Sequence, residues 1–250
     1  MIGKEKIKNI RSLHLKKYRQ KYNKFIAEGT KIVSECIAFI PEHIEVIYAL
    51  PSWIQTLENE SDVIKDKLRE IDARRLKQIS ALDTPNEVLA VIKKTQSNFD
   101  EMGGDMIYLD GIQLPSNAGA ILRIAEWFGI ENILVSPTTC DIFSPKCIQS
   151  SMGSFMRLKF AILPIEAVKS QFIDHQLIVA DAGGNPVAQH QFSHPSILIL
   201  GNEGRGPSSV SFQLADTIVS INRINAAPFP ESLNVSVAAG IICHQWKSSQ

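Results

Sequence analysis

Short apolar segments alternate with helix-like segments through the second half of this 250-residue sequence. Strands buried on both faces of a parallel sheet form near-continuous apolar runs, and the helices between them make the crossover connections. The pattern therefore predicts an α/β fold with a mostly parallel sheet over residues 106–250. The runs predicted as strands span residues 106–110, 133–136, 158–163, 177–180, 196–200 and 217–221.

Residues 1–95 are predicted to form a separate, smaller α/β domain. Ile7, Ile10 and Leu13 recur at helical spacing, which predicts one helix over residues 5–20. Residues 96–105 are polar and include glycines, so a linker is predicted there. The remaining predictions in this half are strands at 24–29, 43–49 and 87–93 and helices at 31–39, 61–70 and 73–81.

The charge is unevenly distributed although the whole chain has a formal net charge of zero. Residues 1–98 carry 18 Lys and Arg against 13 Asp and Glu, a net +5, whereas residues 99–250 carry 8 against 13, a net −5. The first 24 residues are especially basic, with Glu5 as their one acidic residue. The N-terminal half is therefore the better candidate for contacting phosphates, although a solvated basic helix face gives the same pattern.

Several classes of protein are disfavoured. No apolar run approaches the ~20 residues of a membrane span, and the start of the chain lacks an apolar signal region, so we expect a cytoplasmic protein without membrane contact. The cysteines form no C-x-x-C pair, and His190 and His194 have no evident third ligand, so no metal is expected. The run Gly201–Gly206 follows G-x-x-G-x-G rather than the G-x-G-x-x-G of dinucleotide-binding folds, and no P-loop is present.

The C-terminal stretch after Pro230 predicts a helix that contributes polar residues to a site. Apolar residues at helical spacing predict a helix from about Ser232 to Trp246, with Ser232 as its N-cap. The stripe expected to face the core contains Leu233, Val237, Gly240, Ile241 and His244. Asn234 is unusual in a first helical turn, because asparagine competes for backbone hydrogen bonds. It either faces water or, with Ser232, lines a pocket at the helix start.

Two further motifs accompany this stretch: Leu200-Gly201-Asn202-Glu203-Gly204-Arg205-Gly206, and Asn117 to Arg123 (NAGAILR). In order and spacing, the three motifs resemble those of the SpoU-type (TrmH-like) RNA ribose methyltransferases of the knotted SPOUT superfamily, over roughly residues 105–247. The resemblance implies a deep C-terminal trefoil knot and a homodimer. Residues 10–29 resemble, more loosely, the substrate-binding domain that precedes many SpoU domains and is similar in fold to a ribosomal-protein L30-type RNA binder.

The resemblance implies S-adenosylmethionine as the methyl donor. Family members hold the adenosine largely through backbone groups of the knot loops, and the matching positions here are Leu200, Gly201, Ile221 and Leu233. Glycines in the second motif suit this role, because the backbone can approach a ligand closely where no Cβ intervenes. One departure concerns Ile221, which is followed by Asn222 where the family has proline, and then by the stretch 223–230. The cofactor loop therefore departs from the family pattern at this point.

Arg123 is the strongest candidate for a catalytic residue. Spacing alone predicts a surface arginine paired with Glu126 or stacked on Trp127. The resemblance instead implies that Arg123 contacts the RNA phosphate and helps to activate the 2′-hydroxyl. Because arginine is a poor base, a role in orientation and charge stabilisation is the better expectation.

The other candidate catalytic residues come from all three motifs. Asn117 is either the N-cap of its helix or a direct participant in catalysis. The resemblance implies that Glu203 positions Arg123 or the knot loops, and that Ser232 and Asn234 form a third wall of the pocket. Trp246 is expected in the core.

These motifs lead to the expectation of methyl transfer from S-adenosylmethionine to a ribose 2′-hydroxyl of structured RNA. Ribosomal RNA is the first expectation for the substrate, given the L30-like leading domain, and transfer RNA is the second. Two alternatives remain open, a non-catalytic RNA-binding protein of the same fold and a knotted methyltransferase that modifies a base nitrogen. The Asn-Glu-Gly and Ser-Leu-Asn motifs argue against the base-modifying enzyme.

Overall fold

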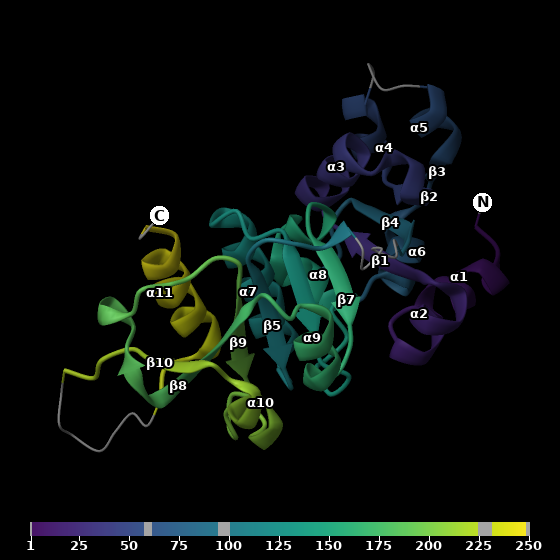
Figure 1. The fold of residues 1–250 in the computed structure, drawn as a ribbon. Helices are drawn as coiled ribbons and strands as arrows, with labels where there is room; N and C mark the ends of the chain where they lie inside the picture. Colours follow the sequence, from purple (N-terminus) through teal and green to yellow (C-terminus); the bar gives the residue numbers. More distant parts are fainter. Residues whose placement is uncertain (1, 58–61, 95–100, 225–231, 249–250) are drawn as a thin grey trace. The chain divides into compact units, whose positions relative to one another are not determined.

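The computed structural model describes residues 2–57, 62–94, 101–224 and 232–248, and its chain divides into two compact units (Figure 1). Unit 1 comprises residues 1–95 and 141–156, and unit 2 comprises residues 96–140 and 157–250. The segment 141–156 thus belongs to unit 1 by its contacts, although it lies in the sequence between two strands of unit 2.

Unit 2 is built on a six-stranded sheet with the order β10-β8-β9-β5-β6-β7. Every neighbouring pair of strands is parallel, which confirms the predicted α/β class and parallel sheet. The central strands β5 and β9 are buried along their whole length, as their apolar runs predict. The strands are β5 (Met106–Asp110), β6 (Asn132–Val135), β7 (Lys159–Ile162), β8 (Gln176–Pro186), β9 (Ser196–Gly201) and β10 (Thr217–Ser220).

Helices cover both faces of this sheet because alternate side chains of each buried strand point to opposite faces. Tyr108, Leu134 and Ile199 form a core with residues of α9 and α10, whereas Ile107 and Leu198 are buried toward the opposite face. Two long helices, α7 and α11, pack against each other, and α11 also contacts β9 (Figure 1). The helices are α7 (Pro115–Trp127), α9 (Ile165–Gln171), α10 (Ser209–Leu214) and α11 (Val235–Ser248), with the short η5 (Val187–Gln189).

Unit 1 is a smaller α/β unit whose sheet has the order β1-β4-β2-β3. Strand β4 is antiparallel to both of its neighbours, and β2 and β3 are parallel. The strands are β1 (Lys24–Glu28), β2 (Ile44–Ala49), β3 (Leu68–Glu70) and β4 (Val88–Lys93). The helices are α1 (Lys4–Ser12), α2 (Lys16–Tyr22), α3 (Thr30–Phe39), η1 (Pro41–His43), α4 (Pro51–Ile54), η2 (Gln55–Leu57), α5 (Asp62–Lys67), α6 (Ala73–Ile79), α8 (Pro145–Ser151) and η4 (Ser154–Met156).

The prediction of one helix over residues 5–20 is wrong, because the chain breaks between α1 and α2. Leu15 has an extended backbone, with φ −102° and ψ 131°. Leu13 is buried in the core of unit 1, and the buried side chain of Arg19 donates from Nη1 to the Leu13 carbonyl oxygen at 2.7 Å. This bond stabilises the turn by satisfying a carbonyl near the end of α1.

The predicted start of the C-terminal helix is also wrong. Helix α11 begins at Val235, and Asn234 rather than Ser232 acts as its cap, since Asn234 Oδ1 accepts a hydrogen bond from the backbone N–H of Ser236 at 2.9 Å. A side-chain oxygen that satisfies a free N–H of the first turn is the usual N-cap interaction.

Four of the five residues in the predicted core-facing stripe of this helix are exposed instead, and only Gly240 is half-buried. Leu233, Val237 and Ile241 are 48%, 52% and 41% exposed, and His244 is exposed as well. The residues that α11 buries are Ala239, Ile242, Cys243 and Trp246. The expectation that Trp246 is a core residue is confirmed, since its side chain is fully buried. Helix α11 therefore has apolar residues on two sides. One side packs against the sheet and α7, and the other is exposed.

Parts of two predictions lie outside the described residues. These are most of the stretch 223–230 before the third motif, and residues 96–100 of the predicted linker. At the end of that linker, Met102 is buried in unit 2, and the side chain of Asp105 is 8% exposed. Within the described ranges, no helix is long and apolar enough to cross a membrane.

Candidate active site

The loops that follow β5 and β9 meet at the carboxyl edge of the parallel sheet. The two strands are neighbours, and Asp110 pairs with Gly201 at their ends. Functional loops of parallel α/β sheets gather at this edge, because every strand ends there. Asn202 Nδ2 donates to the Gly111 carbonyl oxygen at 2.9 Å, so one motif loop is bonded directly to the other.

The loop after β9 is a tight, internally bonded turn. Asn202 and Gly206 exchange two backbone hydrogen bonds, at 2.9 and 3.1 Å, and Asn202 Oδ1 accepts from the backbone N–H groups of Gly204 and Arg205. Gly206 has φ +71°, and a Cβ on Gly201 would lie 2.1 Å from the nitrogen of Pro207. Both positions therefore require glycine. The turn holds its shape through groups that the motif itself supplies.

Glu203 projects from this turn to the start of α7. Its carboxylate accepts hydrogen bonds from the backbone N–H groups of Gln113 and Leu114, at 3.2 and 3.3 Å, and from Asn117 Nδ2 at 2.9 Å. Leu114 is the N-cap residue of α7, and no side chain caps the helix in the usual way. A carboxylate at a helix start is favoured by the free N–H groups and by the helix dipole.

Of the two interpretations of Asn117, the helix cap is wrong, since Leu114 is the N-cap residue. Asn117 lies in the first turn of α7, is 6% exposed, and uses both ends of its side chain to join the other motifs. Its Nδ2 donates to Glu203, and its Oδ1 accepts from Asn234 Nδ2 at 3.1 Å. One residue from each of the three motifs therefore belongs to a single hydrogen-bonded chain.

The direction of this chain is fixed by its two ends. The ionised carboxylate of Glu203 only accepts hydrogen bonds, so Asn117 must turn its NH₂ toward it. The backbone N–H of Ser236 only donates, so Asn234 must turn its oxygen toward Ser236 and its NH₂ toward Asn117. Reversing either amide would place donor against donor and acceptor against acceptor. The chain is a rigid connection across three loops that are distant in sequence.

The hydrogen bonds keep Glu203 ionised. Burial alone would raise its pKa, but donation from Asn117 and from the backbone of Gln113 and Leu114 holds the pKa below the ordinary value for glutamate. A carboxylate with a lowered pKa and several donors is a poor proton acceptor. Its chemical capacity here is to hold Asn117 and the start of α7 in place.

Arg123 lies on the same helix as Asn117, six residues further along, which is about 9 Å along the helix axis. Its side chain is exposed, and it makes no hydrogen bond or ion pair with any other described residue. The two partners that spacing suggested are not used: Glu126 pairs with Arg157, and Trp127 is 83% exposed. Arg123 is thus an exposed cation on the helix that carries Asn117. Its guanidinium is available to an anionic ligand.

The predicted cofactor-contacting residues lie at strand ends on the same edge of the sheet or just before α11. Leu200 and Gly201 are buried at the end of β9, and Ile221 directly follows β10. Leu233 is half-exposed just before α11. Ser232, also exposed, makes no hydrogen bond with another described residue, so its predicted place in a pocket wall stays a prediction.

Strand β8 lies between β9 and β10 in the sheet, and so between the strand ends that carry Gly201 and Ile221. It pairs with β9 only as far as Ala180, whereas its pairing with β10 skips from Val179 to Asn185. Residues 181–184 therefore bulge out of the sheet beside the motif loop, where a Cβ on Gly206 would lie 3.7 Å from Asp181 Oδ2.

A separate cavity of about 390 Å³ is lined by Asn185, Pro186, Gln189, His190 and Gln191, none of them a predicted site residue.

Sequence reasoning missed two contributors to the site. Asn202 organises the motif loop, and an asparagine in a glycine-rich turn after a strand is the available signal, because asparagine side chains often bond nearby backbone. The backbone N–H groups of Gln113 and Leu114 hold Glu203, and Pro115 at the first helical position marks where such free N–H groups occur.

Structural comparison identifies the class of protein. The chain matches a putative RNA methyltransferase of the TrmH family from Porphyromonas gingivalis over the whole of both chains, with a TM-score of 0.88 and 29% identity. The fold also matches the SpoU methyltransferase AviRb from Streptomyces viridochromogenes in complex with its cofactor AdoMet, over 98% of both chains, with a TM-score of 0.79 and 22% identity. A curated relative, the 23S rRNA (guanosine(2553)-2′-O)-methyltransferase RlmP of Bacillus subtilis, is 25% identical over 96% of this chain and 95% of its own.

Family models identify the particular family. The SpoU rRNA Methylase family matches residues 105–244, and the MRM3-like substrate binding domain matches residues 4–90. The chain belongs to the SpoU rRNA Methylase family, which confirms the resemblance seen in its three motifs.

Proposed function

We propose that this protein transfers a methyl group from S-adenosylmethionine to a ribose 2′-hydroxyl of RNA, with ribosomal RNA as the substrate. The observation that carries the proposal is the hydrogen-bonded chain from Glu203 through Asn117 to Asn234. It joins the three family motifs at the carboxyl edge of the sheet, where parallel α/β folds place their ligands.

Arg123 acts on the RNA. Its exposed guanidinium has no anionic partner among the described residues, so it is available to bind a phosphate and to stabilise charge as the 2′-hydroxyl loses its proton. Arginine does not itself take the proton at neutral pH. Glu203 and Asn117 act through position: they fix the start of α7 and thereby the helix that carries Arg123.

The donor supplies an electrophilic methyl group on a sulfonium sulfur. The residues proposed to hold it are Leu200, Gly201, Ile221 and Leu233, and their character fits an adenosine. They offer backbone groups and aliphatic side chains, and the turn after Gly201 is tight enough to exclude any side chain there. Ser232 is proposed as a further pocket residue. No metal is required by this chemistry.

The knot and the domain limits are further proposals that follow from family membership. We propose that the C-terminal loops of unit 2 form a deep trefoil knot, as family membership implies. We also propose that residues 1–95 are an L30-like RNA substrate-binding domain, residues 96–105 a linker, and residues 106–250 the methyltransferase domain. The matched ranges, 4–90 and 105–244, support these limits.

Ribosomal RNA is favoured over transfer RNA by the relatives. RlmP of Bacillus subtilis is named for methylation of 23S rRNA, and so is a Streptomyces viridochromogenes 23S rRNA (uridine(2479)-2′-O)-methyltransferase, 29% identical over 65% of this chain and 60% of its own. The net charge of +5 over residues 1–98 supports a phosphate-binding role for the N-terminal half.

The functional form is proposed to be a homodimer. The exposed apolar residues of α11 and of the start and end of α7 provide the surface. Exposed apolar patches of this kind commonly mark protein–protein contacts. The residues are Leu114, Trp127, Leu233, Val237 and Ile241, with exposed fractions from 41% to 83%.

A labelled-methyl assay tests the function. The protein is incubated with S-adenosylmethionine and 23S rRNA, and nucleosides from the digested RNA are analysed by mass spectrometry. We expect methyl incorporation on a ribose. RNA binding without methyl transfer or cofactor binding would favour the non-catalytic alternative, and a methyl group on a base would favour the base-nitrogen enzyme.

A further inference from the structure

Helix α2 of unit 1 presents an exposed row of apolar side chains. Leu15 just before the helix is 57% exposed, Tyr18 is half-buried, and Tyr22 is 40% exposed. Arg19 of the same helix is buried and ion-paired with Asp141 at 2.8 Å. This buried pair fixes how the helix is rotated, so the tyrosines are held at the surface.

The two tyrosines form a preorganised aromatic platform. Their rings are stacked with centroids 6.0 Å apart and an interplanar angle of 14°. Lys17 Nζ lies 4.8 Å from the Tyr18 ring centroid, and Lys21 Nζ lies 5.5 Å from that of Tyr22. Neither tyrosine hydroxyl bonds another described residue. Among the described residues, the rings have no stacking or cation–π contact beyond each other and the two lysines.

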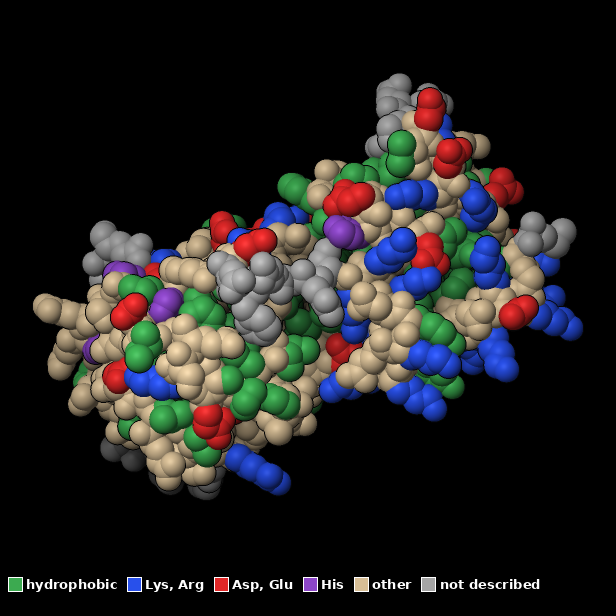
Figure 2. Space-filling model, turned by 45° about the vertical axis from the view of Figure 1, so that its right-hand side comes forward, with side chains coloured by type: hydrophobic (Ala, Val, Ile, Leu, Met, Phe, Trp, Pro, Cys, Tyr) green, Lys and Arg blue, Asp and Glu red, His purple; other side chains and the backbone are tan. Residues whose placement is uncertain are grey.

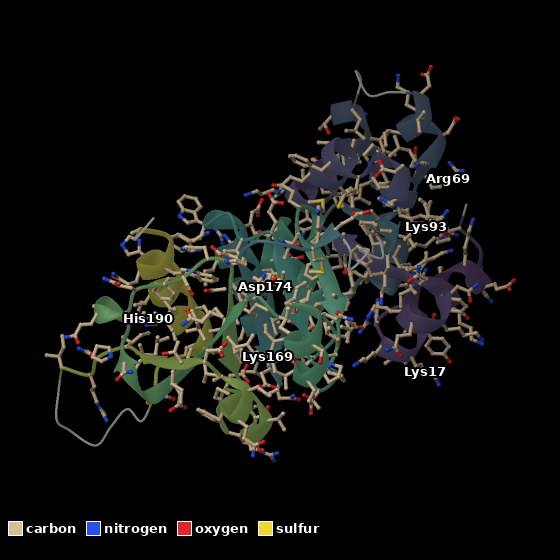
Figure 3. All side chains as sticks on the ribbon, viewed as in Figure 1. Lys17, Arg69, Lys93, Lys169, Asp174 and His190 are labelled. Atoms are coloured by element: carbon tan, nitrogen blue, oxygen red, sulfur yellow. The ribbon has the colours of Figure 1, made fainter. Side chains whose placement is uncertain are left out.

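The surroundings of the platform are strongly cationic. Residues 6–27 contain eight Lys and Arg and no Asp or Glu. Within the described chain, acidic side chains neutralise only Arg19 and Lys24 of these eight, through Asp141 and Glu45. Figure 2 shows Lys and Arg side chains gathered over unit 1, and Figure 3 labels Lys17 on α2.

This combination indicates one kind of partner. Aromatic rings interleaved with lysines bind single-stranded nucleic acid, because every unpaired base has a face for stacking and every nucleotide has a phosphate. Duplex RNA buries its bases and would use only the lysines. An acidic peptide would likewise use the lysines and leave the stacked rings without a role.

We propose that α2 binds an unpaired nucleotide of the RNA substrate, with its base stacked on Tyr22 over Tyr18 and the neighbouring phosphates held by Lys17 and Lys21. The proposal rests on the proposed function, since it assumes that the chain acts on RNA. It adds the mode of recognition: unit 1 selects a single-stranded or looped segment rather than a continuous helix.

Fluorescence anisotropy with the full chain tests the platform. The probes are a labelled 12-nucleotide oligouridylate and a labelled 12-base-pair RNA duplex. We expect Tyr22→Ala to weaken binding of the single strand about 5-fold or more, and to leave binding of the duplex nearly unchanged. Tyr22→Phe keeps the ring and should bind like the unaltered protein. Leu15→Ala is the matched control, because it removes an exposed apolar side chain without an aromatic face.

Three results would contradict the proposal that α2 binds an unpaired nucleotide. One is no binding of the single strand by the unaltered protein. Another is equal binding by Tyr22→Ala, and a third is an equal loss in the Leu15→Ala control. The methyl-transfer assay distinguishes failure of the platform proposal from failure of the proposed enzymatic function. If the unaltered protein methylates rRNA while Tyr22→Ala binds the single strand normally, only the platform proposal fails. If the single strand shows the expected Tyr22 dependence but no RNA is methylated, only the proposed activity fails.

Discussion

The three motifs are connected at the residue scale by hydrogen bonds whose directions have no alternative. An acceptor-only carboxylate at one end and a donor-only backbone N–H at the other orient both asparagine side chains between them. Asn117, in the middle of this chain, is 6% exposed, and a flipped amide there would leave a buried polar group unpaired. The requirement for Asn at positions 117 and 234 follows from this geometry, since the two ends of an amide have opposite hydrogen-bonding character.

Substitution of Glu203 tests this connection. In Glu203→Gln, the new NH₂ group competes with the N–H donors of Gln113, Leu114 and Asn117. We expect a loss of about 1–3 kcal/mol in local stability and a fall in kcat of at least about 10-fold. Activity is measured by methyl transfer, and folding by circular dichroism.

The matched control for Glu203 is Glu131→Gln, which neutralises an exposed glutamate of unit 2. This control should retain normal activity. Equal activity of Glu203→Gln and the unaltered protein would show that the hydrogen-bonded chain does not position the site.

The parallel sheet could be predicted from sequence at the scale of elements, because buried strands have apolar runs that need no knowledge of their neighbours. Each run predicted as a strand in the second half is a strand in the structure. The break between α1 and α2 could not be predicted, because it depends on a bond from Arg19 to the Leu13 carbonyl and on the partner of Arg19, Asp141, 122 residues away. The periodicity of residues 5–20 contains no trace of that partner.

The face that α11 buries could not be predicted for a related reason. This helix is apolar on two sides, so periodicity offers two stripes and does not say which one the sheet covers. For the site, the motifs identified Glu203, Asn117 and Asn234, but their mutual bonds emerged only from the fold. The helix-cap interpretation of Asn117 is wrong because a carboxylate from another loop takes the place of a local cap at α7. That of Ser232 is wrong because Asn234 caps α11.

Asp105 fastens the C-terminal helix to the start of β5 and yields a pH prediction. Burial alone would raise its pKa, but donation from Lys247, His194 and the Ser196 backbone N–H holds the pKa below the ordinary value. For a carboxyl with a lowered folded pKa, the stabilisation is present above the unfolded pKa of about 3.9 and is lost as the pH falls through the folded value. Asp105→Asn should therefore be destabilised by roughly 1–3 kcal/mol at pH 7.

Thermal unfolding at two pH values checks this prediction. The difference in Tm between Asp105→Asn and the unaltered protein should be clear at pH 7 and should shrink as the pH falls below about 3.9, where the carboxyl of the unfolded chain becomes protonated. A difference that does not depend on pH would assign the effect to packing rather than to charge.

The whole molecule combines a basic half with an acidic half, at net charges of +5 and −5 over residues 1–98 and 99–250. The positive charge that favours contact with phosphates therefore lies in the first half, whereas the three site motifs lie in the second. The exposed apolar residues of α7 and α11 belong to the second half, next in sequence to the site, which links the proposed dimer contact to the site itself.

Charges introduced into this apolar surface test the dimer. In the double variant Val237→Asp and Ile241→Asp, two carboxylates would be buried without partners at the proposed contact, which is costly. Multi-angle light scattering should give the mass of two chains for the unaltered protein and of one chain for the variant. Val63→Asp, at a position that is 60% exposed on α5, is the control and should remain a dimer. A dimeric double variant would move the contact elsewhere.

The most direct test of the central claim is methyl transfer by Arg123→Ala, measured on 23S rRNA with labelled S-adenosylmethionine. Because Arg123 bonds no other described residue, the variant should fold and bind S-adenosylmethionine like the unaltered protein. We expect it to transfer no detectable methyl group, whereas the unaltered protein methylates a ribose. Normal turnover by Arg123→Ala, with the same product on the same RNA, would contradict the assignment of the site.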